Sequence, residues 1–339
     1  MTVPPSPYAE AHVDPQGVGD ARPTALQIIR DENLEDKLVG KAIVVTGATS
    51  GIGLETARAL SATGATLFLP ARDLGKARKT LSTILESGRV SLIEMDINSF
   101  ASIRMAASEI LSASQNQVNI LINNAGVMGI QERQLTEDGH ETHFATNYLG
   151  SFLLFQLLKP ALLASASLDL NSRVVNVSSS AHRFCTLMNS DDYDFQKSDY
   201  SHELAYANSK LAAVYMTNEI DRRYGSKGIH ATSIHPGAIN TDISRDIGPG
   251  FVAAIMSNPV VLKILKSPEQ GAATTVLAAV GKEWESKGGK YLEDCQEAER
   301  GKDDGQAFGF GYVCQTYDPK DEERLWRDSL KLVGVSDHL

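Results

Sequence analysis

Short runs of Val, Ile and Leu alternate with helical patterns along most of the chain, and this alternation restricts the fold more than any other feature. Helical patterns lie near residues 52–63, 74–86, 100–113, 136–165 and 203–224, and SPEQGAATTVLAAV adds another. Strands that are apolar throughout and separated by helices are typical of a parallel sheet covered on both faces. We therefore predict a single-domain α/β fold with a Rossmann-like, doubly wound parallel sheet of about seven strands. The strand candidates are KAIVVTG, TLFLP, VSLIEMD, VNILINNAG, RVVNVSS and IHATSIHPG, with GGKYLED as a further one.

The predicted domain occupies residues 39–295, and a segment of different character lies on each side of it. Residues 1–38 hold a Pro-rich arm, which we expect to be flexible up to about residue 23, and a short helix in TALQIIRDENLEDKL. Residues 296–339 are rich in Gly and charge and end in an amphipathic helix, DEERLWRDSLKLVG. We expect this C-terminal extension to pack on the main domain.

Charge, cysteine content and the lack of long apolar runs indicate which partners and which cellular compartment to expect. The 339 residues include 42 acidic and 32 basic ones, a net charge of −10, which argues against a nucleic-acid partner. Three widely spaced cysteines, Cys185, Cys295 and Cys314, fit free thiols in a reducing compartment. No secretory signal is evident, and no uninterrupted apolar run reaches the roughly 18 residues of a membrane span. We expect a cytoplasmic protein, with peripheral membrane contact as the less favoured alternative.

The glycine-rich stretch TGATSGIG, residues 46–53, joins the first predicted strand to its helix. Glycines let the backbone turn sharply and come close to a bound group, and the helix N-terminus then offers N–H groups to a phosphate. A strand before and a helix after this loop indicate a dinucleotide site rather than a plain turn.

The end of the second predicted strand, FLPARD, indicates which dinucleotide is bound. An acidic residue there would bind the ribose hydroxyls of NAD, whereas an Arg suits the 2′-phosphate of NADP. Ala71 stands where the acid is expected, Arg72 follows it, and Asp73 is better placed to cap the next helix. These residues favour NADP.

A tyrosine and a lysine lie four residues apart in AYANSK, residues 205–210. On a helix they share one face, so Tyr206 and Lys210 would be neighbours. A nearby positive charge lowers the pKa of a tyrosine from its ordinary value of about 10, and such a phenol can exchange protons. The alternative is a surface tyrosine with a lysine one turn away.

Five motifs in one order give the chain its resemblance to a known family. TGATSGIG, NNAG at 123–126, NVSS at 176–179, YANSK at 206–210 and HPGAINT at 235–241 resemble the short-chain dehydrogenase/reductase family over residues 39–295. LTEDGHETHFATNYLGSFLL is similar to the retinol-dehydrogenase-like and WW-domain-oxidoreductase-like branch. No WW module is expected, because Trp284 and Trp326 are the only tryptophans.

The resemblance implies four catalytic residues. Tyr206 would be the general acid or base, and Lys210 would lower its pKa and bind the nicotinamide ribose. Ser179 would hydrogen-bond the substrate oxygen, with Ser178 as the weaker candidate since neighbouring strand residues face opposite sides. Asn147 would hold a water that links Lys210 to solvent.

Further residues match the family's cofactor contacts, and Asn123 is expected to brace the sheet instead. The implied cofactor residues are Gly47, Ser50, Ile52, Gly53, Arg72, Asp96, Ile97, Asn124, Ala125, Tyr206, Lys210, Ile239 and Thr241.

The resemblance implies an NADP(H)-dependent oxidoreductase that transfers a hydride between the nicotinamide and a carbonyl, or a primary or secondary alcohol, of a fairly apolar small molecule. One alternative is a ketone reductase of polyketide or terpenoid biosynthesis, and another is a non-redox NADP-binding module. A homodimer or homotetramer is expected by the same resemblance, because members of the family often pair their long helices.

Two histidines in HETH do not form the zinc pattern of metalloproteases, which needs a spacing of four. His140 and His143 are three apart, and no metal site is predicted. His182 and Cys185 follow the serine motif; a solvated loop is favoured for both over contact with substrate.

The roles of two further segments are left open by the sequence. Residues 191–200, DDYDFQKSDY, are either a substrate loop or a solvated insertion. Residues 251–266, FVAAIMSNPVVLKILK, are a lid over an apolar substrate, a membrane contact or a core helix, in that order of preference.

Overall fold

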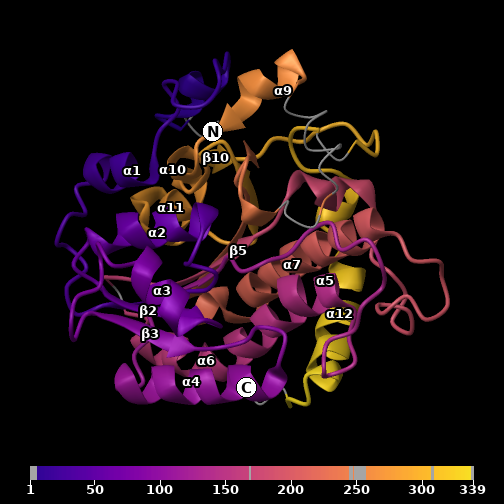
Figure 1. Cartoon of the computed structure of the whole chain (residues 1–339), viewed down its shortest axis with the longest axis horizontal. Coiled ribbons are helices and arrows are strands. Elements are labelled where there is room, and N and C mark those ends of the chain that lie inside the picture. Colours follow the sequence, from indigo (N-terminus) through magenta and orange to yellow (C-terminus); the bar gives the residue numbers. More distant parts are fainter. Residues whose placement is uncertain (1–5, 168, 244–246, 248–256, 307–308, 337–339) are drawn as a thin grey trace.

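An eight-stranded sheet lies at the centre of the computed structural model, which describes residues 6–167, 169–243, 247, 257–306 and 309–336 (Figure 1). The strand order is β10-β9-β6-β5-β4-β1-β2-β3, and every pair is parallel except β9 with the two-residue β10. The predicted doubly wound α/β fold is therefore confirmed. The strands are β1 Ala42–Val45, β2 Thr66–Ala71, β3 Val90–Glu94, β4 Ile120–Asn123, β5 Ser172–Val177, β6 Ile229–His235, β9 Lys290–Glu293 and β10 Gln296–Glu297.

Helices cover both faces of the sheet, which is why its central strands are apolar on both sides. In β1, Val44 packs into the core cluster that includes α4, α6 and α7, whereas Ile43 and Val45 pack into the cluster that includes α1, α2 and α11. The helices are α1 Ala25–Asp31, α2 Gly51–Ser61, α3 Leu74–Thr80, α4 Phe100–Ala113, α5 Thr142–Phe144, α6 Gly150–Ser165, α7 His202–Tyr224, α9 Pro259–Ile264, α10 Pro268–Gly271, α11 Ala273–Val280 and α12 Pro319–Leu332.

The predicted helix over 136–165 begins later, at Thr142. The carboxylate of Glu141 accepts the backbone N–H groups of His143 and Phe144 and so caps the helix there. Ala145–Leu149 is a π-helical segment between α5 and α6. The stretch Thr142–Ser165 is long and apolar enough to span a membrane, but 72% of its most apolar window is buried inside the protein, as in a core helix.

The expectation of a flexible arm is wrong for residues 6–23. Tyr8 and Arg22 are buried, and Ala9–His12 form a 3-10 turn. The guanidinium of Arg22 donates to the carbonyl oxygens of Gly17, Ile264 and Leu265, which ties the arm to the main domain.

The end of α9 continues into a second, two-stranded sheet. Its strand β8, Leu265–Lys266, pairs in parallel with β7, Ala238–Ile239. Helix α9 exposes Val260 and Leu262, so the core-helix reading is wrong for residues 259–264. Residues 251–256 lie outside the described residues, and the lid remains a hypothesis.

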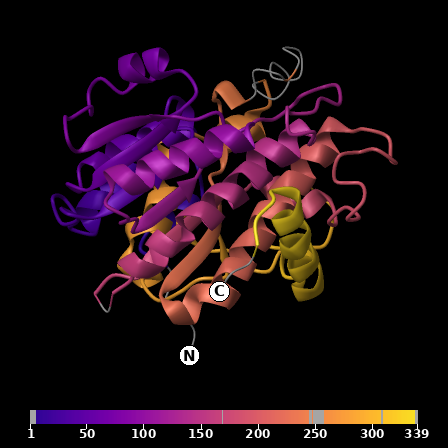
Figure 2. The ribbon, with the colours of Figure 1, turned by 90° about the horizontal axis from the view of Figure 1, so that it is seen from below.

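The C-terminal helix α12 lies beside α7 in both views (Figures 1 and 2). The ring of its buried Trp326 lies 5.0 Å from Phe152 and 6.2 Å from Phe155 of α6, measured between ring centroids. Helix α12 thus covers the part of α6 and α7 that lies around Trp326.

Candidate active site

The phosphate loop has no room for side chains at two of its glycines. A Cβ at Gly53 would lie 2.2 Å from the carbonyl oxygen of Gly47, and one at Gly47, where φ is +68°, would lie 2.8 Å from Cα of Ala125. Asn124 donates to the carbonyl oxygens of Thr46 and Gly47 and holds the loop against the end of β4. Ser50 is the N-cap residue of α2, yet its side chain makes no capping hydrogen bond. This tight loop at a helix N-terminus fits the pyrophosphate of a dinucleotide.

The end of β2 presents Arg72 to solvent. Asp73, as predicted, caps α3 by accepting the N–H of Lys76 at 2.9 Å. Arg72 is therefore the basic side chain at the strand end where a 2′-phosphate would be bound.

The other predicted cofactor residues lie at the carboxyl ends of neighbouring strands. Asp96 follows β3, and its carboxylate accepts the backbone N–H of Asn98. Ile97 packs closely on Gly150, because a Cβ added at Gly150 would lie only 2.5 Å from the carbonyl oxygen of Ile97. Asn123 donates to Asn176 on β5 and braces the sheet, as predicted.

Ile239 at the end of β7 and Thr241, two residues further on, approach the same site. Gly271 packs against both Ile239 and Ile52, because a Cβ added at Gly271 would lie 2.7 Å from Cγ1 of Ile239 and 3.4 Å from Cγ1 of Ile52. Gly51 in the phosphate loop packs against Thr241, because a Cβ added at Gly51 would lie 3.1 Å from Cγ2 of Thr241. The structure thus brings the phosphate loop and β7 together. Most of the predicted cofactor residues are partly exposed. These residues are Gly47, Ser50, Ile52, Asp96, Ile97, Asn124, Ala125, Ile239 and Thr241.

Ser179, two residues after β5, lies near the phenol of Tyr206 on α7, where its hydroxyl opposes the rise in the pKa of that phenol. Its Oγ also accepts the N–H of Ala181 at 3.1 Å, which leaves its own proton for the phenol. Ser178 faces the other way and donates to the carbonyl oxygen of Lys210 at 2.7 Å. The alternation along β5 therefore favours Ser179 over Ser178 as a site residue.

Lys210 is buried one turn from Tyr206, with its Nζ 5.7 Å from the centroid of the phenol ring. Its ammonium donates to the carbonyl oxygen of Val177 at 2.9 Å. Burial lowers the pKa of Lys210 to about 8. Burial also raises the pKa of Tyr206 to about 12, and the hydroxyl of Ser179 has a smaller, opposing effect. Part of the surface of Tyr206 is still exposed to solvent. The net shift of the Tyr206 pKa is therefore upward, opposite to the expected lowering, and burial is its largest cause, while the charge of Lys210 is not among the effects that act on it.

Asn147 lies in the π-helical segment and directs its amide toward the same place. Its Nδ2 donates to the carbonyl oxygen of Val127 and to Oγ of Ser209, and its Oδ1 accepts the N–H of Val127 at 2.8 Å. A Cβ at Gly126 would lie 3.1 Å from Oδ1 of Asn147 and 3.5 Å from Nζ of Lys210, so these two side chains flank Gly126. The structure therefore assembles all four predicted catalytic side chains around one end of the sheet.

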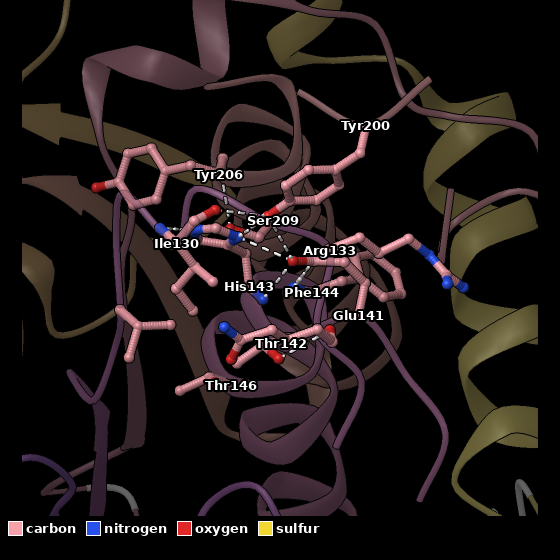
Figure 3. Close-up of polar contacts among 12 residues, drawn as sticks. Ile130, Arg133, Glu141, Thr142, His143, Phe144, Thr146, Tyr200, Tyr206 and Ser209 are labelled. Carbon is pink, nitrogen blue, oxygen red and sulfur yellow. Dashed lines mark hydrogen bonds and ion pairs between the residues drawn. The ribbon is translucent and has the colours of Figure 1, made fainter. Parts of the chain in front are cut away.

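Three residues that the sequence analysis did not place in the site lie beside Tyr206 (Figure 3). The rings of His143 and Tyr206 have centroids 6.3 Å apart and meet edge to face at 75°. His143 is bonded to Glu141, and the hydroxyl of Tyr200 contacts both. The HETH motif contains two of them, Glu141 and His143.

The solvated-loop readings of His182 and Cys185 are wrong, since both side chains are buried. His182 bonds the carbonyl oxygen of Ser179 through Nδ1 and the hydroxyl of Thr316 through Nε2, and burial lowers its pKa to about 4. Burial raises the pKa of Cys185 to about 12.

The acidic stretch 191–200 is not a solvated insertion either. Tyr193 and Phe195 are buried, and the hydroxyl of Tyr193 donates to Asp328 on α12. The carboxylate of Asp192 accepts the N–H groups of Lys197 and Ser198.

Comparison with known proteins gives the same family that the five sequence motifs resemble. A family model described as short chain dehydrogenase matches residues 41–193. The short-chain dehydrogenase/reductase prx1 of Penicillium roqueforti is 46% identical over 330 residues, 97% of this chain and 96% of its own. Human retinol dehydrogenase 13 is 35% identical over 304 residues, 87% of this chain and 85% of its own.

Solved structures share the fold. An uncharacterized protein from Mycobacterium paratuberculosis superposes with a TM-score of 0.68 at 29% identity, covering 89% of this chain and 96% of its own. The RhlG/NADP active-site complex of Pseudomonas aeruginosa gives a TM-score of 0.60 at 27% identity, over 76% of this chain and 95% of its own. With its ordered motifs, its strand order and these relatives, the chain belongs to the short-chain dehydrogenase/reductase family and resembles retinol dehydrogenases within it.

Proposed function

We propose that this protein is an NADP(H)-dependent oxidoreductase that transfers a hydride between the nicotinamide and a carbonyl or alcohol carbon of a fairly apolar small molecule. The observation that carries the proposal is the placement of Ser179 near the phenol of Tyr206, with the buried Lys210 one turn away and its Nζ 5.7 Å from the phenol ring. Two hydroxyl groups and a buried amine lie together at the end of the sheet where the predicted cofactor residues meet.

The chemistry of reduction suits these groups. The cofactor, when bound, supplies the hydride, and negative charge then builds on the substrate oxygen. The hydroxyls of Ser179 and Tyr206 would donate hydrogen bonds to that oxygen and stabilise the charge as it forms. Tyr206, whose raised pKa keeps it protonated near neutral pH, would deliver the proton, because an alkoxide is a stronger base than a phenolate. Lys210 would bind the nicotinamide ribose, and Asn147 would hold the water that renews the proton.

The preference for NADP rests on the exposed Arg72 after β2, where Ala71 stands in place of the acidic residue expected for NAD. Asp73, the nearest acid, is engaged as the cap of α3. A structural relative was solved as a complex with NADP, which agrees with this choice. Arg72, Ser50 and the glycines of the phosphate loop would hold the phosphates of the cofactor.

The substrate class rests on relatives and on the family's chemistry. Retinol dehydrogenase 13 takes its name from a long apolar alcohol, and this chain is 35% identical to it. We propose a small apolar aldehyde, ketone or alcohol as the substrate of this protein.

A direct test supplies purified protein with NADPH or NADH and a panel of all-trans-retinal, decanal and menthone. Loss of the nicotinamide absorbance reports turnover. We expect oxidation of NADPH with at least one carbonyl compound, and slower oxidation of NADH. NADPH binding without turnover of any compound, with both reaction directions assayed, would favour the non-redox module instead.

A further inference from the structure

A polar cluster lies beside the ring of Tyr206, on the side away from its hydroxyl (Figure 3). We call Glu141, His143 and Tyr200 the Glu141 cluster. The side chains of Glu141 and His143 have no exposed surface. Oε1 of Glu141 accepts the backbone N–H of His143 and bonds its Nδ1 at 2.8 Å, while Oε2 accepts the N–H of Phe144 at 2.8 Å. A buried carboxylate with several donors is a rigid anchor.

The cluster also holds both polar backbone groups of Ile130. Nε2 of His143 lies 3.4 Å from the N–H of Ile130 and accepts from it, which leaves the ring proton on Nδ1, facing Glu141. The hydroxyl of Tyr200 donates to the carbonyl oxygen of Ile130 at 2.9 Å. The loop that follows β4 is therefore pinned by two side chains from other parts of the chain.

The contact with Tyr206 is through the ring and not through the hydroxyl. The His143 ring meets the Tyr206 ring edge to face. In Figure 3 the Tyr206 hydroxyl points away from the cluster. His143 thus cannot pass a proton to that hydroxyl, but it limits how far the phenol ring can tilt.

The cluster joins three segments that border the proposed site. One is the loop after β4, where Val127 is bound to Asn147. Another is the start of α5, capped by Glu141. The third is Tyr200, two residues before α7, the helix that carries Tyr206.

We propose that His143 is a positioning residue for hydride transfer, held in place by Glu141 and Tyr200. It fixes the ring of Tyr206 and the Ile130 loop, so that the phenol keeps its orientation toward the substrate oxygen. This proposal rests on the proposed function, because it assigns a role relative to Tyr206 as the proton donor.

The test compares Tyr200→Phe and His143→Phe with the wild type, using NADPH and whichever carbonyl compound of the panel the wild type reduces. Tyr200→Phe removes one hydroxyl and keeps the ring, so it should fold. Tyr193→Phe is the matched control, because it also removes one hydroxyl from the stretch 191–200. That hydroxyl donates to Asp328 on α12 and does not belong to the Glu141 cluster. We expect kcat to fall about tenfold or more in Tyr200→Phe and further in His143→Phe, since misplaced catalytic groups are costly. The KM for NADPH should not change, and Tyr193→Phe should match the wild type.

A purely structural role would give a different result. A kcat that is unchanged in both variants, or that recovers fully when the assay temperature is far below the melting temperature of each variant, overturns the proposal. Tyr206→Phe separates this failure from that of the proposed function. If Tyr206→Phe is inactive while Tyr200→Phe and His143→Phe match the wild type, the positioning role alone has failed. If Tyr206→Phe retains wild-type turnover, the proposed function has failed.

Discussion

The guanidinium of Arg22 donates a hydrogen bond of 2.5 Å to the carbonyl oxygen of Leu265, which lies 243 residues further along the chain. Leu265 begins β8, and β8 pairs with Ala238–Ile239, the strand predicted to hold the nicotinamide end of the cofactor. Lys266, next to Leu265, packs on Gly237 and forms an ion pair with Asp294 at 2.7 Å. The N-terminal arm thus supports one wall of the proposed cofactor site.

Removing this support should affect both stability and cofactor binding. We predict that Arg22→Ala lowers the free energy of unfolding by about 3 kcal/mol, because buried carbonyl groups lose charged donors. The Kd of NADPH should rise about fivefold as β7 and β8 lose their fixed arrangement. Urea unfolding and fluorescence titration measure the two effects.

Arg30→Ala is the control for this prediction. Arg30 is largely exposed, and its ion pair with Glu35 has a nitrogen–oxygen distance of 3.5 Å. Such a pair contributes about 0.5 kcal/mol or less. Equal effects of the two substitutions would contradict the supporting role of the arm.

Arg72 should decide the choice of cofactor. We predict that Arg72→Ala raises the KM for NADPH by about tenfold, since a guanidinium pairs strongly with a phosphate, and leaves the KM for NADH unchanged. Arg78→Ala, on the exposed side of α3, should change neither value. Steady-state kinetics with both cofactors check this, and a parallel rise in both KM values would exclude a role in 2′-phosphate recognition.

Glu293, at the end of β9, should make stability depend on pH. Burial raises the pKa of this carboxyl from 4.5 to about 7, while its Oε1 accepts the N–H of Gly311 at 2.6 Å. Between these pKa values the native protein binds the proton and the unfolded chain does not. The stabilising effect of the protonated form is complete below about pH 4.5 and is lost as the pH rises through about 7.

The variant Glu293→Gln tests this dependence, because an amide keeps the acceptor for Gly311 and has no charge to bury. We predict that the variant is more stable than the wild type by about 3 kcal/mol at about pH 8.5 and equally stable at about pH 4.5. Urea unfolding at the two pH values measures the difference. A constant difference at both would show that Glu293 does not titrate as described.

The sheet and the main helices could be predicted because their signals are local. A buried strand such as Ala42–Val45 is apolar at every position, and the glycine loop after it has few compatible structures. The start of α5 at Thr142 could not be placed by periodicity alone, since it depends on the cap that Glu141 provides. The sequence does contain that cap, three residues before Phe144.

The arm and the electrostatics of the site could not be predicted, because both depend on distant residues. The stretch around Arg22 has no periodic pattern, and its order comes from carbonyl groups more than 200 residues away. For Tyr206 the spacing to Lys210 predicts a neighbouring amine but not the burial of the phenol, and burial determines the direction of its pKa shift. Tyr200 and His143 meet only after the chain has folded.

The most direct test of the account is a comparison of wild type and Tyr206→Phe in NADPH binding and in turnover of the same carbonyl compound. The variant keeps the ring that packs on His143 and loses only the proton donor. We predict an unchanged Kd for NADPH and a fall in kcat of at least about 100-fold. A variant that binds NADPH and reduces the compound at the wild-type rate would contradict the central claim that Tyr206 delivers the proton.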